Sequence, residues 1–287
     1  AEDGRHLGRG NKVACLPELR GSGRVIAEPG SVQTVMHVLG KADAAARLRD
    51  PVANRGGSLE FQRLRRVKQL GFAHLVYPGA VHNRFLHALG VYHLTGRAID
   101  ALERKGQLDR LDDLSRRTIP EIKLAALLHD VGHYAFSHAM EELEPEAIPG
   151  HHEEVADQFL ESPGIRTALD EQGAGAVQRI GDLIRGRSLH PLQGLVSGSL
   201  DLDKIDYLRR DSLFCGVPYG AVDVDRLLDS LTLARQTESD ALEVAVTEKG
   251  ISALESLMFA KYQMFRNVYW HHAVRSATVA FRRLVEG

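Results

Sequence analysis

A long amphipathic pattern constrains the fold of this chain most. Over 82–106, the segment HNRFLHALGVYHLTGRAIDALERKG repeats apolar side chains at intervals of three and four, and Gly106 ends it. Further helical patterns cover 59–70, 119–132, 151–162, 198–216 and 251–287, the last as one long helix or a helix pair. LTLAR and LEVAVTE alternate around a polar turn, as the strands of a hairpin do. The sequence therefore predicts a mainly α fold with one small β-hairpin.

The N-terminal part of the chain differs from the rest. Six glycines fall within the first thirty positions, so we expect 1–45 to be a poorly ordered or peripheral segment and 46–287 to form one domain. The chain has neither a glycine-rich phosphate loop nor a regular alternation of strands and helices. This argues against a Rossmann or P-loop nucleotide-binding fold.

Composition narrows the class of partner. The net charge of −2 provides no overall positive field to attract nucleic acid or an anionic membrane. The two cysteines, Cys15 and Cys215, lack CxxC spacing, which suits a reducing compartment. Since no apolar run is long enough to span a bilayer, we expect a cytoplasmic protein with neither membrane nor nucleic-acid partners.

Histidines concentrate in one quarter of the chain, with eight of the fourteen between His82 and His152. Within this region, LLHDVGH places His129 and Asp130 at the end of an apolar helix. Adjacent helical side chains point about 100° apart, but at a helix end beside a glycine both can turn toward one ion. The alternative is that His129 is a core histidine and Asp130 a polar end residue.

Two other segments offer inward-facing ligands. His87 shares a helix face with Val91 and Leu94, and Asp203 sits in SLDLDKIDYL between Leu202 and Ile205. Buried carboxylates are normally paired or bound to metal. With His129 and Asp130, these side chains form a plausible two-nitrogen, two-oxygen site for one divalent ion such as Mn, Fe, Zn, Ni or Mg.

At these residues the sequence resembles a known family. PGAVHNRFLHALGV, LLHDVGHYAFSHAME, a following His-Glu pair and DLDKIDYLRRD resemble the HD-domain phosphohydrolases, and among them the deoxynucleoside triphosphate triphosphohydrolases. The resemblance extends from roughly Glu60 to Arg275. It implies an HD-domain helical fold, hydrolysis of dNTPs to deoxynucleoside and inorganic triphosphate, one divalent metal with Mn or Mg favoured, and a homo-oligomer (dimer or tetramer).

The resemblance also implies roles for individual residues. The family's metal ligands match His87, His129, Asp130 and Asp203. Its catalytic groups match His133 and His138, which reach the phosphates and the leaving group, Glu141, which orients His138, and His152. Both His133 and His138 suit the role of general acid, so that choice stays open.

The implied substrate contacts come from several segments. Arg84 and Lys261 match residues that contact the triphosphate; Lys204, Tyr207 and Asp211 match residues that hold phosphate and sugar; Tyr269 matches a tyrosine that packs under the deoxyribose. The family has an arginine where this chain has Lys261. The alternative interpretation is that Arg84 and the strip Lys204–Asp211 are solvated polar surface.

The chain departs from the family upstream. RDPVANRGGSLEF keeps Asp50 and Pro51 but lacks a His-Gly pair, either through a true deletion or because a loop is missing. Gly57 stands where an activator site would have an acidic residue, which argues against guanine-nucleotide activation even though Gln62 and Arg65 persist. Alternative functions are another HD nucleotide phosphohydrolase (a nucleotidase or an alarmone or cyclic-nucleotide hydrolase), a non-catalytic nucleotide sensor, and a single-strand nuclease using RLRRVK.

Overall fold

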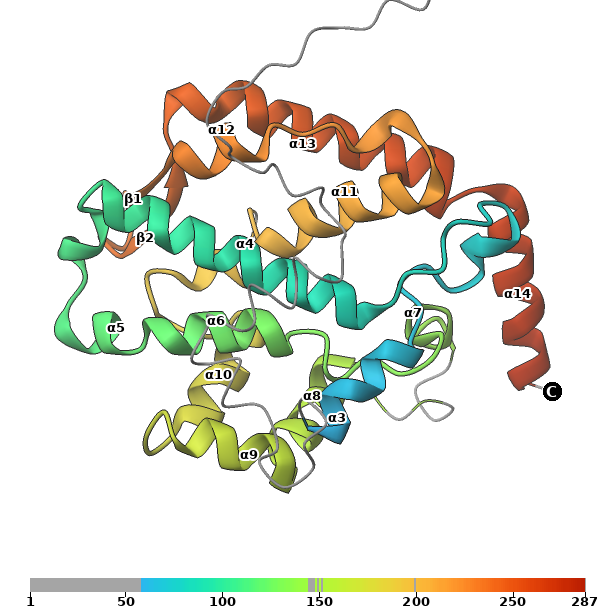
Figure 1. Ribbon diagram of the computed structural model, residues 1–287, viewed down its shortest axis with the longest axis horizontal. Helices are drawn as coiled ribbons and strands as arrows, with labels where there is room; N and C mark the ends of the chain where they lie inside the picture. The colour runs from blue at the N-terminus through green and yellow to red at the C-terminus, as the bar shows by residue number, and fades with distance from the viewer. Residues whose placement is uncertain (1–57, 144–147, 149, 151, 199, 287) are drawn as a thin grey trace, which may run out of the picture.

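The computed structural model describes residues 58–143, 148, 150, 152–198 and 200–286. The described part is mostly helical (Figure 1). Its helices are α3 (Leu59–Gln62), α4 (Arg84–Arg104), α5 (Asp113–Arg117), α6 (Ile119–Leu128), α7 (Ser137–Met140), α8 (His152–Leu160), α9 (Pro163–Asp170), α10 (Ala176–Ile184), α11 (Leu202–Cys215), α12 (Val224–Asp229), α13 (Ile251–Met264) and α14 (His272–Glu286). The predictions about 1–45 and about the short stretch before Ser58 fall outside the described residues.

Helix α4 is the centre of the fold, with α6 on one side and α11 on the other (Figure 1). Asn83 caps its N-terminus, where the side chain accepts a hydrogen bond from the backbone N–H of Leu86 at 3.1 Å. Helix α6 is apolar on almost every side, and Leu124 through Leu128 are all buried. A helix that is apolar all round belongs in a core. Three packed helices therefore hold the segments that carry His87, His129 and Asp203.

The predicted hairpin and helical class are confirmed. Strands β1 (Leu231–Arg235) and β2 (Leu242–Val246) pair antiparallel, with Leu231 opposite Val246 and Leu233 opposite Val244. Leu231 and Leu233 are buried, so the hairpin covers the core with one face. None of the helices in the described ranges has the length and apolarity needed to cross a membrane.

The helix predicted over 59–70 is wrong in its second half. Helix α3 ends at Gln62, a 3₁₀ turn follows over Arg63–Arg66, and Val67 is extended. The Val67 carbonyl accepts the backbone N–H of Arg84 at 2.9 Å. This long-range pairing outweighs the local helical pattern. The C-terminal segment is a helix pair, α13 and α14, joined by a π-helical turn over Phe265–Tyr269.

Candidate active site

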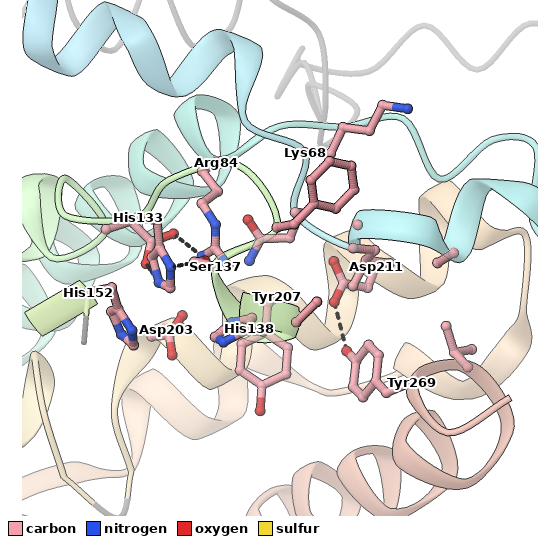
Figure 2. Close-up of a pocket in the computed structure, with 18 of the residues that line it drawn as sticks. Lys68, Arg84, His133, Ser137, His138, His152, Asp203, Tyr207, Asp211 and Tyr269 are labelled. Carbon is pink, nitrogen blue, oxygen red and sulfur yellow. Dashed lines mark hydrogen bonds and ion pairs between the residues drawn. The ribbon is translucent and has the colours of Figure 1, made fainter. Parts of the chain in front are cut away.

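A cavity of about 590 Å³ opens beside α4, α6 and α11 (Figure 2). Its wall includes the turn after α6, the short helix α7, one face of α11 and the π-helical turn before α14. His129, Asp130 and Asp203 lie on this wall, and so do Asp211 and Tyr269. Three of the four predicted metal ligands and the predicted sugar contacts therefore share one pocket; His87 is buried and is not on the wall.

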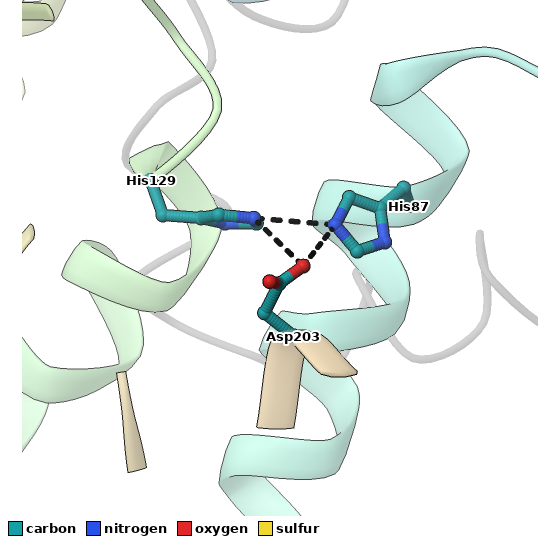
Figure 3. Close-up of side chains that lie close together, drawn as sticks. All are labelled: His87, His129 and Asp203. Carbon is teal, nitrogen blue, oxygen red and sulfur yellow. Dashed lines mark hydrogen bonds and ion pairs between the residues drawn. The ribbon is translucent and has the colours of Figure 1, made fainter. Parts of the chain in front are cut away.

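Three of the predicted metal ligands meet at one point (Figure 3). His87 comes from α4, His129 is the C-terminal cap of α6, and Asp203 lies in the first turn of α11. The Nε2 atoms of the two histidines are 3.2 Å apart, and Asp203 Oδ1 lies 2.8 Å from His87 Nε2 and 3.7 Å from His129 Nε2. A single cation can contact all three groups.

Asp130 lies beside this group, and the four predicted ligands are called the metal cluster below. Its Oδ1 lies 3.3 Å from His129 Nε2, and its Oδ2 lies 3.9 Å from His87 Nε2. The α-helix ends at Leu128, so Asp130 is in a turn and its side chain shares the direction of His129. Burial alone would raise the pKa of Asp130, but Arg84, followed by His129 and His133, holds it well below its usual value.

The hydrogen bonds around the cluster test whether it suits a metal ion. His87 Nδ1 lies 2.8 Å from Asp206 Oδ2, and His129 Nδ1 lies 2.9 Å from the Ala126 carbonyl oxygen. When each Nδ1–H donates to these acceptors, the two Nε2 lone pairs face each other and the carboxylates. Burial alone would lower the pKa of His87, but hydrogen bonds with Asp203 and Asp206 raise it to about 10. The cluster thus attracts positive charge, and its donor set fits a divalent metal ion.

Next to the cluster, His133 is buried and its two ring nitrogens are occupied. Nε2 lies 3.2 Å from Asp130 Oδ1, and Nδ1 lies 2.7 Å from Ser137 Oγ. Its ring stacks on His152 with 3.8 Å between centroids. Burial, with a further contribution from Arg84, lowers the pKa of His133 to about 3. His133 is therefore a neutral ring that packs beneath His152.

Glu141 contacts two histidines, and these three residues are called the mouth group below. Its Oε1 accepts from His152 Nδ1 at 2.7 Å and from the His152 backbone N–H at 3.1 Å, whereas its Oε2 is 3.5 Å from His138 Nδ1. The predicted partner His138 is therefore within reach of Glu141 at this longer distance, and the closer contacts of Glu141 are with His152. Helix α7 is only four residues long and leaves the His138 side chain 65% exposed at the pocket.

Three predicted substrate contacts, called the sugar end below, lie in another part of the pocket: Tyr207 and Asp211 on α11, and Tyr269 in the π-helical turn. Tyr269 donates its hydroxyl to Asp211 Oδ2 at 2.7 Å, and the rings of Tyr207 and Tyr269 meet edge to face at 6.3 Å (Figure 2). Burial and the neighbouring carboxylate raise the pKa of Tyr269 well above its usual value, so it remains a donor. All three residues line the cavity.

Comparison with known proteins shows that most residues lining the pocket fall within two matched regions of one family. Residues 84–211 match the HD domain, and residues 222–287 match the HD associated region. This chain is an HD-domain protein. The match to the HD domain covers all four residues of the metal cluster, and the associated region supplies Tyr269.

Similar proteins include both named and uncharacterised members. The HD-domain protein is 36% identical to YwfO of Bacillus subtilis over 80% of this chain and 50% of that one. It is 31% identical to the deoxynucleoside triphosphate triphosphohydrolase SAMHD1 homolog of Dictyostelium discoideum, over 76% and 42%. A solved phosphohydrolase from Bacteroides thetaiotaomicron superposes with a TM-score of 0.66 at 32% identity, over 83% and 53%. The chain thus spans about half the length of its curated relatives.

Two of the predicted substrate contacts lie off the wall of this HD domain's pocket. Lys204 Nζ donates to Asp201 Oδ2 at 2.5 Å and to the Gly198 carbonyl at 2.9 Å. Lys261 Nζ lies 6.0 Å from the centre of the Phe265 ring. Neither lysine lines the cavity, whereas Arg84 does and donates to Asp130 Oδ2 at 2.8 Å.

Other residues were missed from sequence. Asp206 holds the His87 ring and is itself held by Arg210, whose Nε and Nη2 each donate at 2.8 Å. Gly90 leaves the space for this carboxylate, because a Cβ at that position would collide with Asp206 Oδ1. The one available signal was spacing, since Asp206 follows Asp203 by three residues and shares its helix face.

A second missed residue supports the turn after α6. Arg63 lies before the HD match, and its Nη1 donates to the His133 carbonyl at 2.6 Å while Nη2 donates to the Val131 carbonyl at 2.5 Å. The planar guanidinium therefore fixes the turn that carries Asp130 and His133. The sequence offered only an arginine-rich run, RLRRVK, which is more often a solvated helix face.

Proposed function

We propose that this HD-domain protein is a metal-dependent phosphohydrolase that converts dNTPs to deoxynucleoside and inorganic triphosphate. One observation carries the proposal: three of the four cluster residues (His129, Asp130 and Asp203) and the sugar end line the same cavity of about 590 Å³. A pocket with a cation site at one end and a carboxylate-tyrosine pair at the other suits a substrate that carries phosphates and a sugar. The resemblance to HD phosphohydrolases and to a SAMHD1 homolog supports the same reaction class.

His87, His129, Asp130 and Asp203 would hold one divalent ion, for which we favour Mn or Mg. Bound there, such an ion would supply Lewis acidity and would make water more acidic. Asp206 and the Ala126 carbonyl orient the two imidazoles through their Nδ1 atoms. The protein's own contribution at this end is to fix the ligand rings before the ion arrives.

Arg84 is the first candidate for neutralising the triphosphate. It is buried, lines the cavity and already lies against the cluster through Asp130. Its fork of donors suits phosphate oxygens. Lys204 and Lys261 would add charge only if their flexible side chains turn toward bound phosphate, because Lys204 is paired with Asp201 and neither lysine lines the cavity.

His138 is the better candidate for the general acid that protonates the leaving 5′-oxygen. Both nitrogens of His133 have partners, whereas His138 is exposed to the pocket and has a carboxylate 3.5 Å from its Nδ1. General-acid catalysis of this kind typically contributes about 100- to 10,000-fold. His152, held by Glu141 and stacked on His133, would pack against the phosphates.

Product analysis tests the proposal. The protein is incubated with Mn or Mg and each of the four dNTPs and four rNTPs, and released inorganic triphosphate, pyrophosphate and orthophosphate are separated. We expect triphosphate from dNTPs and much less from rNTPs. Release of orthophosphate or pyrophosphate would contradict the substrate assignment and point to another HD phosphohydrolase, and hydrolysis of none would favour a nucleotide sensor. We further propose a homo-oligomer, which light scattering of the same sample tests.

A further inference from the structure

Asp211 is held from two sides. Its carboxylate is buried, with 1% of the residue exposed, and each oxygen has a partner at 2.7 Å. Tyr269 donates its hydroxyl to Oδ2, and His82 Nε2 lies against Oδ1. An ionised carboxylate has about four lone-pair sites, so each oxygen keeps acceptor capacity after these contacts. The pair of contacts therefore fixes the orientation of Asp211 without using up its capacity to accept.

His82 lies behind Asp211 and away from the pocket wall. It is 2% exposed, and it is absent from the residues that line the cavity, whereas Asp211 and Tyr269 are among them. Its ring stacks on Phe214 with 4.5 Å between centroids. Within the described part of the chain, the His82 Nδ1 atom has no hydrogen-bond partner. The ring therefore makes its hydrogen bond to Asp211 through Nε2. That assigns the proton to Nε2, which donates to the carboxylate.

The backbone of His82 also supports the part of the pocket wall that contains Lys68 and Gln69. Its carbonyl accepts the backbone N–H of Gln69 at 3.1 Å, next to the bridge between Lys68 and Asn83. Lys68 and Gln69 line the cavity. One buried residue therefore connects the segment before α4 with the carboxylate on α11.

We propose that His82 is a positioning residue that, together with Tyr269, aims Asp211 at the 3′-hydroxyl of the substrate's sugar and so sets selectivity for nucleotides that carry this hydroxyl. The inference rests on the proposed function. A carboxylate locked by two donors presents its remaining lone pairs in a fixed direction, and a substrate hydroxyl can donate to it. His82 acts through Asp211 and does not contact the substrate.

The test compares a dNTP with its 2′,3′-dideoxy analogue, which lacks the hydroxyl. In His82→Phe, which keeps the stacking on Phe214, and in His82→Asn, whose amide is too short, the ratio of kcat/KM for the two substrates should fall about 10-fold. His82→Gln keeps a donor at similar reach and should restore most of the ratio. Tyr269→Phe should lower the ratio as well, because it removes the other donor to Asp211. His93→Phe, an exposed histidine on α4, is the matched control and should keep the ratio.

The outcomes separate the two proposals. An unchanged ratio in folded, metal-loaded His82→Phe or His82→Asn would overturn the positioning role while leaving dNTP hydrolysis standing. An equal loss for both substrates would also overturn it, since that loss indicates a merely structural role. If the wild-type protein releases no triphosphate from any dNTP, the proposed function fails first and this inference fails with it.

Discussion

The metal cluster and the mouth group are built in contrasting ways. The cluster ligands come from α4, the end of α6 and α11, and the His87 side chain is only 1% exposed. His138 of the mouth group sits on a four-residue helix with its side chain 65% exposed. Side chains on long packed helices keep their geometry without a ligand, whereas exposed groups adjust when a substrate arrives. In the free protein the proposed metal site is therefore already formed, whereas the proposed acid is loosely held.

The largest effect should come from breaking the cluster. His129→Ala combined with Asp130→Ala removes two of four ligands, so hydrolysis and bound metal should disappear together. Elemental analysis of the purified protein and triphosphate release measure both. His93→Ala, on the exposed side of α4, serves as the control. A double variant that remains metal-loaded and active would show that the cluster is not the metal site.

The mouth group should separate catalysis from metal binding. His138→Asn cannot deliver a proton at neutral pH, so kcat should fall by at least about 100-fold. Metal content should stay at the wild-type level, because His138 is no part of the cluster. Steady-state kinetics and elemental analysis on one preparation decide this. Wild-type turnover in His138→Asn would transfer the acid role to another histidine.

The sequence predicted which residues form the metal cluster better than it predicted the contacts of the residues around them, and the reasons are physical. Periodicity placed His87 on an inward face of α4, and an apolar helix ending in His129 and Asp130 left few other positions for those side chains. By contrast, the contacts of Glu141 depend on how α7 and α8 pack, so the resemblance implied its pairing with His138 but not its closer contact with His152.

Long side chains and long-range backbone pairing account for the remaining differences between the sequence predictions and the structure. Lys204 and Lys261 have several rotatable bonds, and their resting partners, Asp201 and Phe265, follow from local packing that no motif encodes. The pattern over 59–70 is helical, but pairing of Val67 with Arg84 ends the helix early. Asp206 carries no motif of its own, so its role became visible only through its contact with His87.

A milder change, at Asp206, tests how the His87 ring of the metal cluster is held in place. Asp206→Asn weakens the acceptor for His87 Nδ1 while keeping the side-chain shape, so metal affinity should fall about 10- to 100-fold. Competition with a chelator measures this. Asp225→Asn is the matched control, since Asp225 pairs with Arg97 at the surface and its side chain is 79% exposed. Equal affinities in the two variants would contradict the orienting role of Asp206.

The smallest effect is expected for the two lysines. Lys204→Ala and Lys261→Ala each remove a cation that lies off the pocket wall, so kcat/KM for dNTP should fall by no more than about 5-fold. Arg84→Ala should cost far more, because Arg84 is buried against Asp130. Losses for either lysine that match the loss for Arg84→Ala would mean that the lysine moves into the pocket when substrate binds.

The most direct measurement of the central claim follows the oxygen of water. Hydrolysis of a dNTP with Mn or Mg in ¹⁸O-labelled water, followed by mass spectrometry of both products, locates the bond that breaks. If water attacks the α-phosphorus and the 5′-oxygen leaves, one ¹⁸O appears in the inorganic triphosphate and none in the deoxynucleoside. Label in a nucleoside monophosphate or in orthophosphate would contradict the account.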